Sequence, residues 1–423
     1  MAVNETLSRE HTKLNVLMSV RERALGLERF GDAPLNYTPE NPVADSCPAK
    51  VSALVYSLTE EAADFCLICI DLLWLSDEIC QSLRQRISKR WRLPPQNICL
   101  CASHTHGSPN TEPKFNFEPA SSGYLNSLKD VILDVVDGTF EAKRMPASLY
   151  VQCCEVPDLS INRRRKALFI KDRRIKIRVQ NLPNPTRTSN NQLVVINFKH
   201  ADTGRCLLSL VNYACHPVTS PASTTGADYP GWCRAFIHEQ VKDRRAVMFL
   251  QGFCGDIRPA LFHKPAGLKD HILEILIGRR FRKSKSGDDV EFGRRLAEHF
   301  LRLAGKKEFP VSSLPGRVKQ YSLPLILDDK SQVERNLMIT QWPLGDITLL
   351  FLSGEILSGY AQPFTPENRV IHIGYSNGMC GYIPTAKDLP EGGYEVDGSR
   401  ERFNLPRRVS KEFCDQLMRV IKD

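Results

Sequence analysis

The stretch "FCLICIDLLWLSDEICQSLRQRISKRWRLPPQNICLCAS", residues 65–103, contains the alternation that decides the fold class. It begins and ends in apolar runs, 64–73 and 97–103, which are typical of buried strands. Residues 76–91 between them begin with a serine, a preferred N-cap, and space apolar residues at i, i+4, which predicts an amphipathic helix. A strand, a helix and a strand in succession favour an α/β fold with both sheet faces covered.

The same alternation continues on both sides of this stretch. Apolar runs predict further strands at 51–57, 147–153, 192–199, 206–213, 245–251, 316–326 and 346–353. Amphipathic patterns predict helices at 124–138, 231–243, 290–305 and 410–423. Residues 181–191 and 262–288 are expected to form surface loops, the second partly helical. No internal repeat or long linker separates these segments, so we expect one α/β domain, with mixed β-sheets flanked by helices, over residues 1–423.

The composition is that of a globular protein. Hydrophobic residues make up 42% of the chain, and no apolar run approaches the roughly 20 residues of a membrane span. Residues 1–15 lack the apolar segment of a secretory signal, so a cytoplasmic location is expected. Cysteines such as Cys215 and Cys254 lie beside apolar runs, as buried free thiols do. Cys66 and Cys69 form one CxxC, but a strand would point them to opposite faces and no second CxxC accompanies it, which argues against a zinc ribbon.

The net charge of +9 is concentrated in two basic runs, residues 162–180 and 279–285. Such runs bind nucleic acid, a phospholipid surface or an acidic substrate, or they are simply solvated faces. The first run alternates basic and apolar residues, as a half-exposed strand does. Because no zinc-finger, RNP or Walker motif accompanies the charge, a nucleic-acid partner is not expected, whereas an anionic membrane surface stays open.

Five segments each follow an apolar strand and precede a turn or helix, the usual location of sites in α/β proteins. They are "CASHTHGSP" (101–109), "LSLVNYACHPVTS" (208–220), "AVMFLQGFCGDIRPAL" (246–261), "ITLLFLSGEILSGYAQ" (347–362) and "GYSNGMCGYIPTAKDLPEGGYEVDGS" (374–399). In a strand, residues i and i+2 share a face, so His104 and His106 are expected to point into one cleft. Imidazole suits zinc, and a hydrogen-bonded strand end without chemistry is the alternative, for this pair and for His216.

The other three segments leave the role of their polar residues open. Asp256 either caps a tight turn or belongs to a site that its glycines allow a ligand to approach. Glu355, at a predicted strand-to-helix corner, is either an acid helped by a helix N-terminus or a carboxylate ligand. The long loop with Tyr382 and Tyr394 is typical of functional loops, although loop tyrosines commonly serve packing.

Taken together and in this order, the five segments resemble the neutral (non-lysosomal) ceramidase family. The catalytic domain of that family has a His-Thr-His stretch, a His-Pro strand end, a Gly-Asp loop, a Gly-Glu corner and a tyrosine-bearing loop. The loop gives the sharpest match, because the family places a "YITT"-type and a "YEG"-type tyrosine at a fixed spacing. Here "YIPT" and "YEV" place Tyr382 and Tyr394 at the same spacing.

The resemblance implies a set of site residues. The zinc ligands of the family fall on His104, His216, Glu355 and Tyr382. His106 and Tyr394 fall on residues that contact the scissile carbonyl, and the "NR" of "SINRRR" places Arg163 near the substrate. Asp71 occupies a place like that of a family aspartate and is assigned to the substrate site with it.

The chain departs from the family in two ways. The loop that reads Gly-Asp-Val-Ser-Pro in the ceramidases reads "GDIRP" here, so Arg258 stands at the position of a serine. A cation there is expected to bind substrate, and an acidic group on the substrate becomes plausible. The C-terminal β-sandwich domain of the ceramidases is expected to be absent.

The implied mechanism is amide hydrolysis at zinc. Two imidazoles, a carboxylate and a phenol leave zinc able to hold a water, whose pKa falls to roughly 7, so that hydroxide attacks the carbonyl. His106 and Tyr394 would donate hydrogen bonds to the oxyanion, and one of them or Asp256 would protonate the leaving amine. The chain has neither the HExxH motif of metalloproteases nor the GxSxG motif of serine hydrolases.

Three functions are therefore compared. The first is a zinc-dependent amidohydrolase acting on a small-molecule or lipid-like N-acyl amide. The second keeps the fold and the zinc in a biosynthetic enzyme acting on an ester, a lactone or a phosphorylated intermediate, motivated by Arg258. The third is a non-catalytic basic protein that binds nucleic acid or an anionic membrane, and it rests on the two basic runs alone.

Overall fold

Residues 65–103 form the strand, helix and strand that their sequence predicts. β3 (Phe65–Ile70) and β4 (Ile98–Ala102) pair in parallel, and α1 (Asp77–Trp91) connects them. The Ser76 hydroxyl caps α1 by accepting a hydrogen bond from the backbone N–H of Ile79. The computed structural model describes residues 13–25, 47–57, 65–171, 174–187, 189–222, 224–314 and 316–422.

This unit lies at one edge of a large sheet. In the described part of the chain, the strands of the large sheet follow the order β11-β10-β9-β5-β1-β2-β3-β4, and β13 pairs with β5. The β3–β4 and β10–β11 pairs are parallel and the other pairs are antiparallel. The remaining strands are β1 (Asn15–Ala24), β2 (Lys50–Ser57), β5 (Met145–Glu155), β9 (Gln192–His200), β10 (Cys206–Tyr213), β11 (Ala246–Gln251) and β13 (Phe309–Pro310). The mixed α/β class predicted from the sequence is confirmed.

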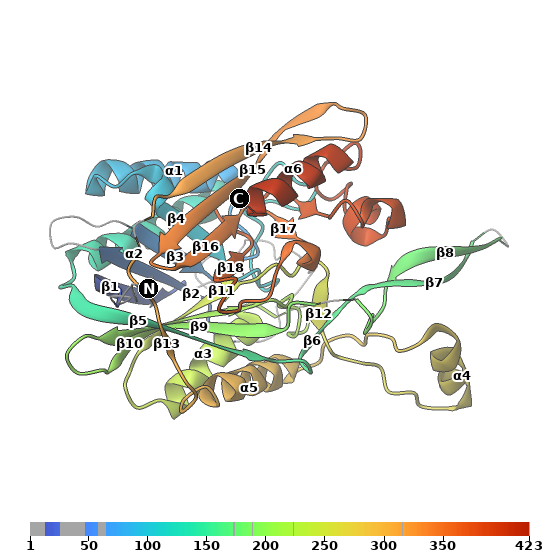
Figure 1. Ribbon diagram of the computed structural model, residues 1–423. Helices are drawn as coiled ribbons and strands as arrows, with labels where there is room; N and C mark the ends of the chain where they lie inside the picture. The colour runs from blue at the N-terminus through green and yellow to red at the C-terminus, as the bar shows by residue number, and fades with distance from the viewer. Residues whose placement is uncertain are drawn as a thin grey trace, which may run out of the picture.

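Helices cover one face of the large sheet (Figure 1). α1 and α2 (Ser122–Glu141) bury Leu83 and Ile132 against Ile68 of β3. α3 (Asp228–Gln240) and α5 (Asp288–Leu301) pack on the β9–β11 side of the same face. Each of these helices has an apolar stripe, and packing against the sheet removes that stripe from water.

A second, smaller sheet covers the other face. Its strands are β14 (Lys319–Ile326), β15 (Gln332–Leu344), β16 (Ile347–Leu352) and β18 (Val370–Ile373). Trp342 and Phe351 of this sheet pack into one apolar cluster with Tyr56 and Phe198 of the large sheet. α6 (Lys411–Lys422) packs against the small sheet from outside, through residues that include Phe413. The predicted covering of both faces is therefore achieved by helices on one side and a sheet on the other.

Short paired segments lie beside these layers. They are β6 (Ser160–Asn162) with β12 (Ile257–Pro259), β17 (Glu355–Ile356) with β19 (Tyr382–Ile383), and β7 (Arg164–Lys171) with β8 (Arg174–Asn181). Single turns occur at η2 (Pro95–Asn97), η3 (Ser358–Tyr360), η4 (Leu389–Glu391) and η5 (Tyr394–Gly398), the last a π-helical turn. These segments carry four of the ten predicted site residues: Arg258, Glu355, Tyr382 and Tyr394.

The β7–β8 hairpin and α4 (Leu268–Ile277) project from the body of the protein on the same side (Figure 1). A Cβ added at Gly278, directly after α4, would lie 1.9 Å from the Arg165 guanidinium, so the base of α4 lies against β7. Both projections expose aliphatic side chains. The exposed fractions are 58% for Leu168, 71% for Ile177, 77% for Leu268 and 82% for Ile275.

Every predicted strand and helix overlaps an observed one, but β1, β15 and β18 and the short strands β6, β12, β13, β17 and β19 were not predicted. The basic run 162–180 forms two paired strands rather than one, and 262–288 contains α4, as expected of a partly helical loop. The cysteines are free thiols, and Cys66 and Cys69 belong to apolar clusters on opposite faces of β3. Within the described residues, no helix combines the length and the apolar character needed to cross a bilayer.

Candidate metal centre

His104 lies in the loop that follows β4, not in a strand. β4 ends at Ala102, and His104 has a φ of 66°, a left-handed conformation that residues other than glycine seldom adopt. The expectation that two strand residues share a face is therefore wrong for His104 and His106, although their rings lie 5.0 Å apart. The turn is held by the His104 Nδ1–H, which donates to the carbonyl of Leu73 at 2.9 Å. Nε2 of His104 is left facing the interior without a hydrogen bond.

His216 is oriented in the same way from the other side. It follows the end of β10 and is buried. Its Nδ1–H donates to the carbonyl of Cys254 at 2.6 Å and lies 3.1 Å from that of Ile257. Backbone acceptors on Nδ1 fix the tautomer and leave the Nε2 lone pair for another partner, as is usual for metal-binding histidines.

Glu355 and Tyr382 complete the cluster. Oε2 of Glu355 lies 3.5 Å from Nε2 of His104 and 3.4 Å from Nε2 of His216. The Tyr382 hydroxyl lies 3.5 Å from the same His216 nitrogen. Glu355 is not at a strand-to-helix corner as predicted, because it belongs to β17 and the 3₁₀ turn η3 follows. No helix dipole therefore acts on this carboxylate.

Three separations between donor atoms match those of tetrahedral zinc ligands: His104 to Glu355, His216 to Glu355 and His216 to Tyr382. Bonds of about 2.0–2.1 Å place neighbouring ligand atoms roughly 3.4 Å apart in a tetrahedron, close to the distances found here. Glu355 Oε2 and His104 Nε2 are buried without hydrogen bonds, a costly arrangement that a cation would relieve. The four residues present thus fit zinc.

The electrostatics of the cluster also suit a cation. Burial raises the pKa of the Glu355 carboxyl, but the two histidines outweigh it and hold that pKa well below its ordinary range. Burial and the nearby Arg163 lower the pKa of His216 to about 4. Burial, followed by the charge of Glu355, raises the pKa of Tyr382. In the metal-free cluster, the Glu355 carboxylate is therefore charged beside a neutral His216 and a neutral Tyr382 phenol.

His106 offers another ligand combination. His104, His106 and His216 present nitrogens that all lie within 4.8 Å of one another, so these three residues can also hold a metal ion. One observation favours Glu355 over His106 as the third ligand, since Glu355 approaches both other histidines within 3.5 Å. His106 lines a cavity beside the cluster, and its pKa is lowered by burial and by the other two histidines.

That cavity has a volume of about 490 Å³. Among the predicted site residues, it brings together His106, Arg163, His216, Arg258, Tyr382 and Tyr394. Lys283 and Arg402 also line it, and the sequence did not single them out, although Lys283 lies in the second basic run. Apart from Asp71, the substrate-facing residues implied by the resemblance thus line one cavity.

Arg163 connects the cavity to the cluster. Its guanidinium donates to the Tyr382 hydroxyl at 2.9 Å, to the Gly255 carbonyl at 2.8 Å and to Glu395 at 2.7 Å. Burial lowers the pKa of Arg163, but Tyr382 and Glu395 more than compensate and keep it charged. Arg163 therefore orients the Tyr382 hydroxyl by a charged hydrogen bond.

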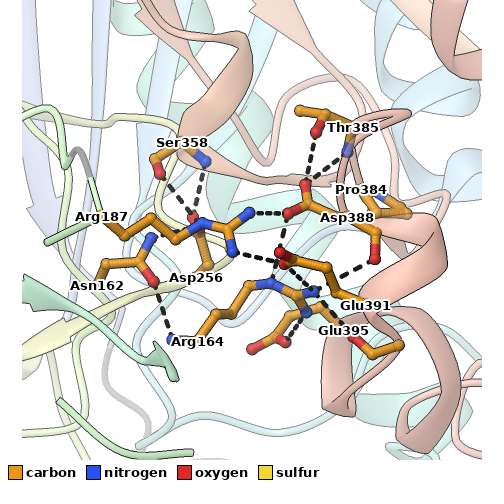
Figure 2. Close-up of polar contacts among 12 residues, drawn as sticks. Asn162, Arg164, Arg187, Asp256, Ser358, Pro384, Thr385, Asp388, Glu391 and Glu395 are labelled. Carbon is orange, nitrogen blue, oxygen red and sulfur yellow. Dashed lines mark hydrogen bonds and ion pairs between the residues drawn. The ribbon is translucent and has the colours of Figure 1, made fainter. Parts of the chain in front are cut away.

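A buried charge network holds the tyrosine loop in place (Figure 2). The Arg164 guanidinium, with none of its side chain exposed, donates to Glu395 at 2.6 Å and lies 3.5 Å from Asp388. Arg187 also pairs with Asp388, and donates to Glu391 at 2.8 Å. Glu395 directly follows Tyr394, so this network fixes the start of η5. No sequence motif distinguishes Glu395 from other acids of the loop.

Two predicted carboxylates lie away from the cavity. Asp256 accepts hydrogen bonds from Asn162 at 2.7 Å and from the backbone N–H of Ser358 at 2.7 Å (Figure 2). Asp71 forms a two-point ion pair with Arg234 and accepts from the backbone N–H of Lys50 at 2.8 Å. Neither residue lines the cavity, and both link separate segments of the fold.

Comparison with solved structures identifies neutral ceramidase as similar in fold. The neutral ceramidase from Pseudomonas aeruginosa superposes with a TM-score of 0.70 over 97% of this chain and 74% of the ceramidase, at 13% identity. A ceramidase complexed with C2 gives the same TM-score and coverage at 12% identity. No family model matches the sequence, and no curated protein does. At this identity the similarity shows a shared fold.

Proposed function

We propose that this protein is a zinc-dependent hydrolase that cleaves an N-acyl amide. The observation that carries the proposal is the approach of Glu355 Oε2 to Nε2 of both His104 and His216, with the Tyr382 hydroxyl beside them. These four residues would hold the zinc. The fold shared with the ceramidases supports a lipid-like amide as substrate.

Zinc in such a site supplies a Lewis acid and a water of lowered pKa. The surrounding residues determine where the substrate lies. His106 and Tyr394 line the cavity next to His216, so their polar atoms can hydrogen-bond the carbonyl oxygen of the bond to be cleaved. A donor placed in this way contributes about 3 kcal/mol to transition-state stabilisation.

The proton for the leaving amine comes from a group on the cavity wall. His106 and Tyr394 both qualify, since both line the cavity. Asp256 was a third candidate, but its oxygens accept from Asn162 and Ser358 and it does not line the cavity. We therefore assign Asp256 to positioning, because its backbone carbonyl also accepts from the N–H of Arg163 at 2.8 Å.

The two projections supply a surface for an anionic membrane. Ile177 and Ile275 are among their most exposed aliphatic side chains, and Lys176 of β8 and Lys269 of α4 are exposed on the same two elements. Aliphatic groups flanked by cations suit the interface of a bilayer that contains acidic lipids. A lipid-like substrate would then be taken from that surface.

Metal content and turnover test the function together. Zinc-loaded wild-type protein is expected to bind about one zinc per chain and to release fatty acid from an N-acyl amide. His104→Ala should lose both properties, while His200→Ala, at the end of β9, should keep both. Full zinc occupancy in His104→Ala would refute the ligand assignment. Turnover of an ester, lactone or phosphorylated compound instead of any amide would support the biosynthetic alternative.

A further inference from the structure

The cavity beside the metal centre has an unbalanced charge. The described residues that line it include Arg163, Arg258, Lys283 and Arg402, and one carboxylate, Asp228. One carboxylate cannot balance four cations, and backbone N–H groups hold the oxygens of Asp228 in place. Its oxygens accept from the N–H groups of Ser220 at 2.8 Å and Tyr229 at 2.6 Å.

The positive charges of the cavity differ in how they are compensated. Arg163 is paired with Glu395. For Arg258, no carboxylate of the described chain lies within 4.0 Å, and the neighbour of its guanidinium is the ring of Phe281, 5.0 Å from the ring centroid. Burial, followed by the charge of Arg163, lowers the pKa of Arg258. Burying a cation without a counter-ion is energetically costly. An anion that binds beside Arg258 would relieve this cost, and its binding is favoured for that reason.

The backbone of Arg258 is held in place by strand pairing. It lies in β12, opposite Ile161 of β6, so the side chain extends from a fixed point on the cavity wall. Lys283 lies two residues beyond Phe281, lines the same cavity, and likewise has no ion-pair partner in the part of the chain described. Two uncompensated cations therefore face the hollow that contains His106 and Tyr394.

We propose that the cavity binds a substrate with an acidic group, a phosphate or a carboxylate, held by Arg258 and Lys283 while the scissile carbonyl lies against His106 and Tyr394. The bond that is cleaved rests on the proposed function, whereas the anion site does not. A guanidinium binds either acid through paired, charge-assisted hydrogen bonds. A volume of about 490 Å³ is within the usual range for a small-molecule site.

Anion binding is tested without any reaction. Inorganic phosphate and acetate are titrated calorimetrically into zinc-loaded protein and again into chelator-treated protein, which removes direct binding to zinc. Arg258→Gln and Lys283→Gln are each expected to weaken the zinc-independent binding about tenfold, as for the loss of one charge-assisted contact. Lys89→Gln is the matched control, since Lys89 is exposed on α1 and loses the same charge. No binding by the wild type, or equal losses in all three variants, would overturn the proposal.

Turnover identifies the acid. N-dodecanoylethanolamine, its phosphate ester and N-dodecanoyl-β-alanine form a series with neutral, phosphate and carboxylate ends. The wild type is expected to prefer an acidic member, and Arg258→Gln to reduce that preference in kcat/KM about tenfold relative to Lys89→Gln. Equal turnover of all three would refute the acidic substrate and leave the hydrolase standing. If none reacts, the hydrolase proposal fails, and the titration alone still decides the anion site.

Discussion

Glu355 and Tyr382 lie directly opposite one another in the parallel pairing of β17 and β19. The backbone N–H of Glu355 donates to the carbonyl of Gly381 at 2.9 Å and fixes this register. Because directly opposed residues of paired strands point to the same face, the two side chains reach one point beside His104 and His216. Half of the proposed metal centre is thus set by a two-residue ladder, and the other half by two loop histidines.

This ladder leads to the first prediction, for Glu355→Gln. The substitution keeps the shape of the side chain but removes the one charge that lies within 3.5 Å of both histidines. We expect zinc affinity to fall by at least 100-fold, on the order of 3 kcal/mol. Competition with a zinc-sensitive dye measures it, and Glu412→Gln, exposed on α6, is the control. An unchanged zinc affinity in Glu355→Gln would exclude this carboxylate as a ligand.

A second prediction concerns the charge network under the tyrosine loop. Arg164→Met removes a guanidinium that pairs with Glu395 and Asp388, and leaves these two carboxylates buried with less compensating positive charge. We expect the free energy of unfolding, measured in urea, to fall by about 3–5 kcal/mol. Arg86→Met removes an exposed pair, in which Arg86 is 3.9 Å from Asp130, and should change it by less than about 1 kcal/mol. Similar values for both variants would show that the network does not stabilise the loop.

The fold was largely predictable because its signals are local. The apolar run of β3, the serine cap of α1 and the apolar run of β4 each specify their own element. The missed strands β15 and β18 pack against the large sheet, where Trp342 of β15 contacts Phe65 of β3, far earlier in the chain. Local periodicity carries little information about such contacts.

The site was predictable as a set of residues but not as a geometry. Strand periodicity placed His104 and His106 on one face, whereas a left-handed turn after β4 actually brings their rings together. The role of Glu395 arises from Arg163 and Arg164, more than 200 positions earlier in the chain. Nothing in the loop itself distinguishes that carboxylate from Glu391, since both follow the same glycine- and proline-rich pattern.

A third prediction tests the role of Tyr394. Tyr394→Phe removes the hydroxyl and keeps the ring, which packs 5.6 Å from that of Tyr382. If the hydroxyl stabilises the oxyanion, kcat should fall about 100-fold while KM and zinc content stay close to the wild type. Tyr321→Phe, on the exposed strand β14, is the control. A change in KM alone would assign Tyr394 to substrate binding instead.

A fourth prediction concerns the projecting hairpin and α4. Ile275→Glu should weaken binding to vesicles of phosphatidylcholine and phosphatidylserine at least tenfold, because burying an isoleucine contributes about 1.5–3 kcal/mol. Binding should also weaken as salt is raised, and be weaker still to pure phosphatidylcholine. Ser82→Glu on α1 adds the same charge away from the projections. Co-sedimentation that Ile275→Glu leaves unchanged would exclude α4 from membrane contact.

The last prediction is a pH dependence that arises outside the metal centre. Burial lowers the pKa of His372, in β18, from 6.5 to about 4. Between these two values the unfolded chain binds a proton that the folded protein does not, so acidification favours unfolding. The stability is fully present above pH 6.5 and declines as the pH falls toward 4, by about 3 kcal/mol in total.

His372→Gln isolates this contribution, because glutamine is similar in size and does not titrate. The difference between wild type and His372→Gln in the free energy of unfolding should shift by about 3 kcal/mol across this window. His200→Gln, at a partly exposed position at the end of β9, is the control substitution. Parallel pH profiles for wild type and His372→Gln would mean that this buried imidazole does not resist protonation.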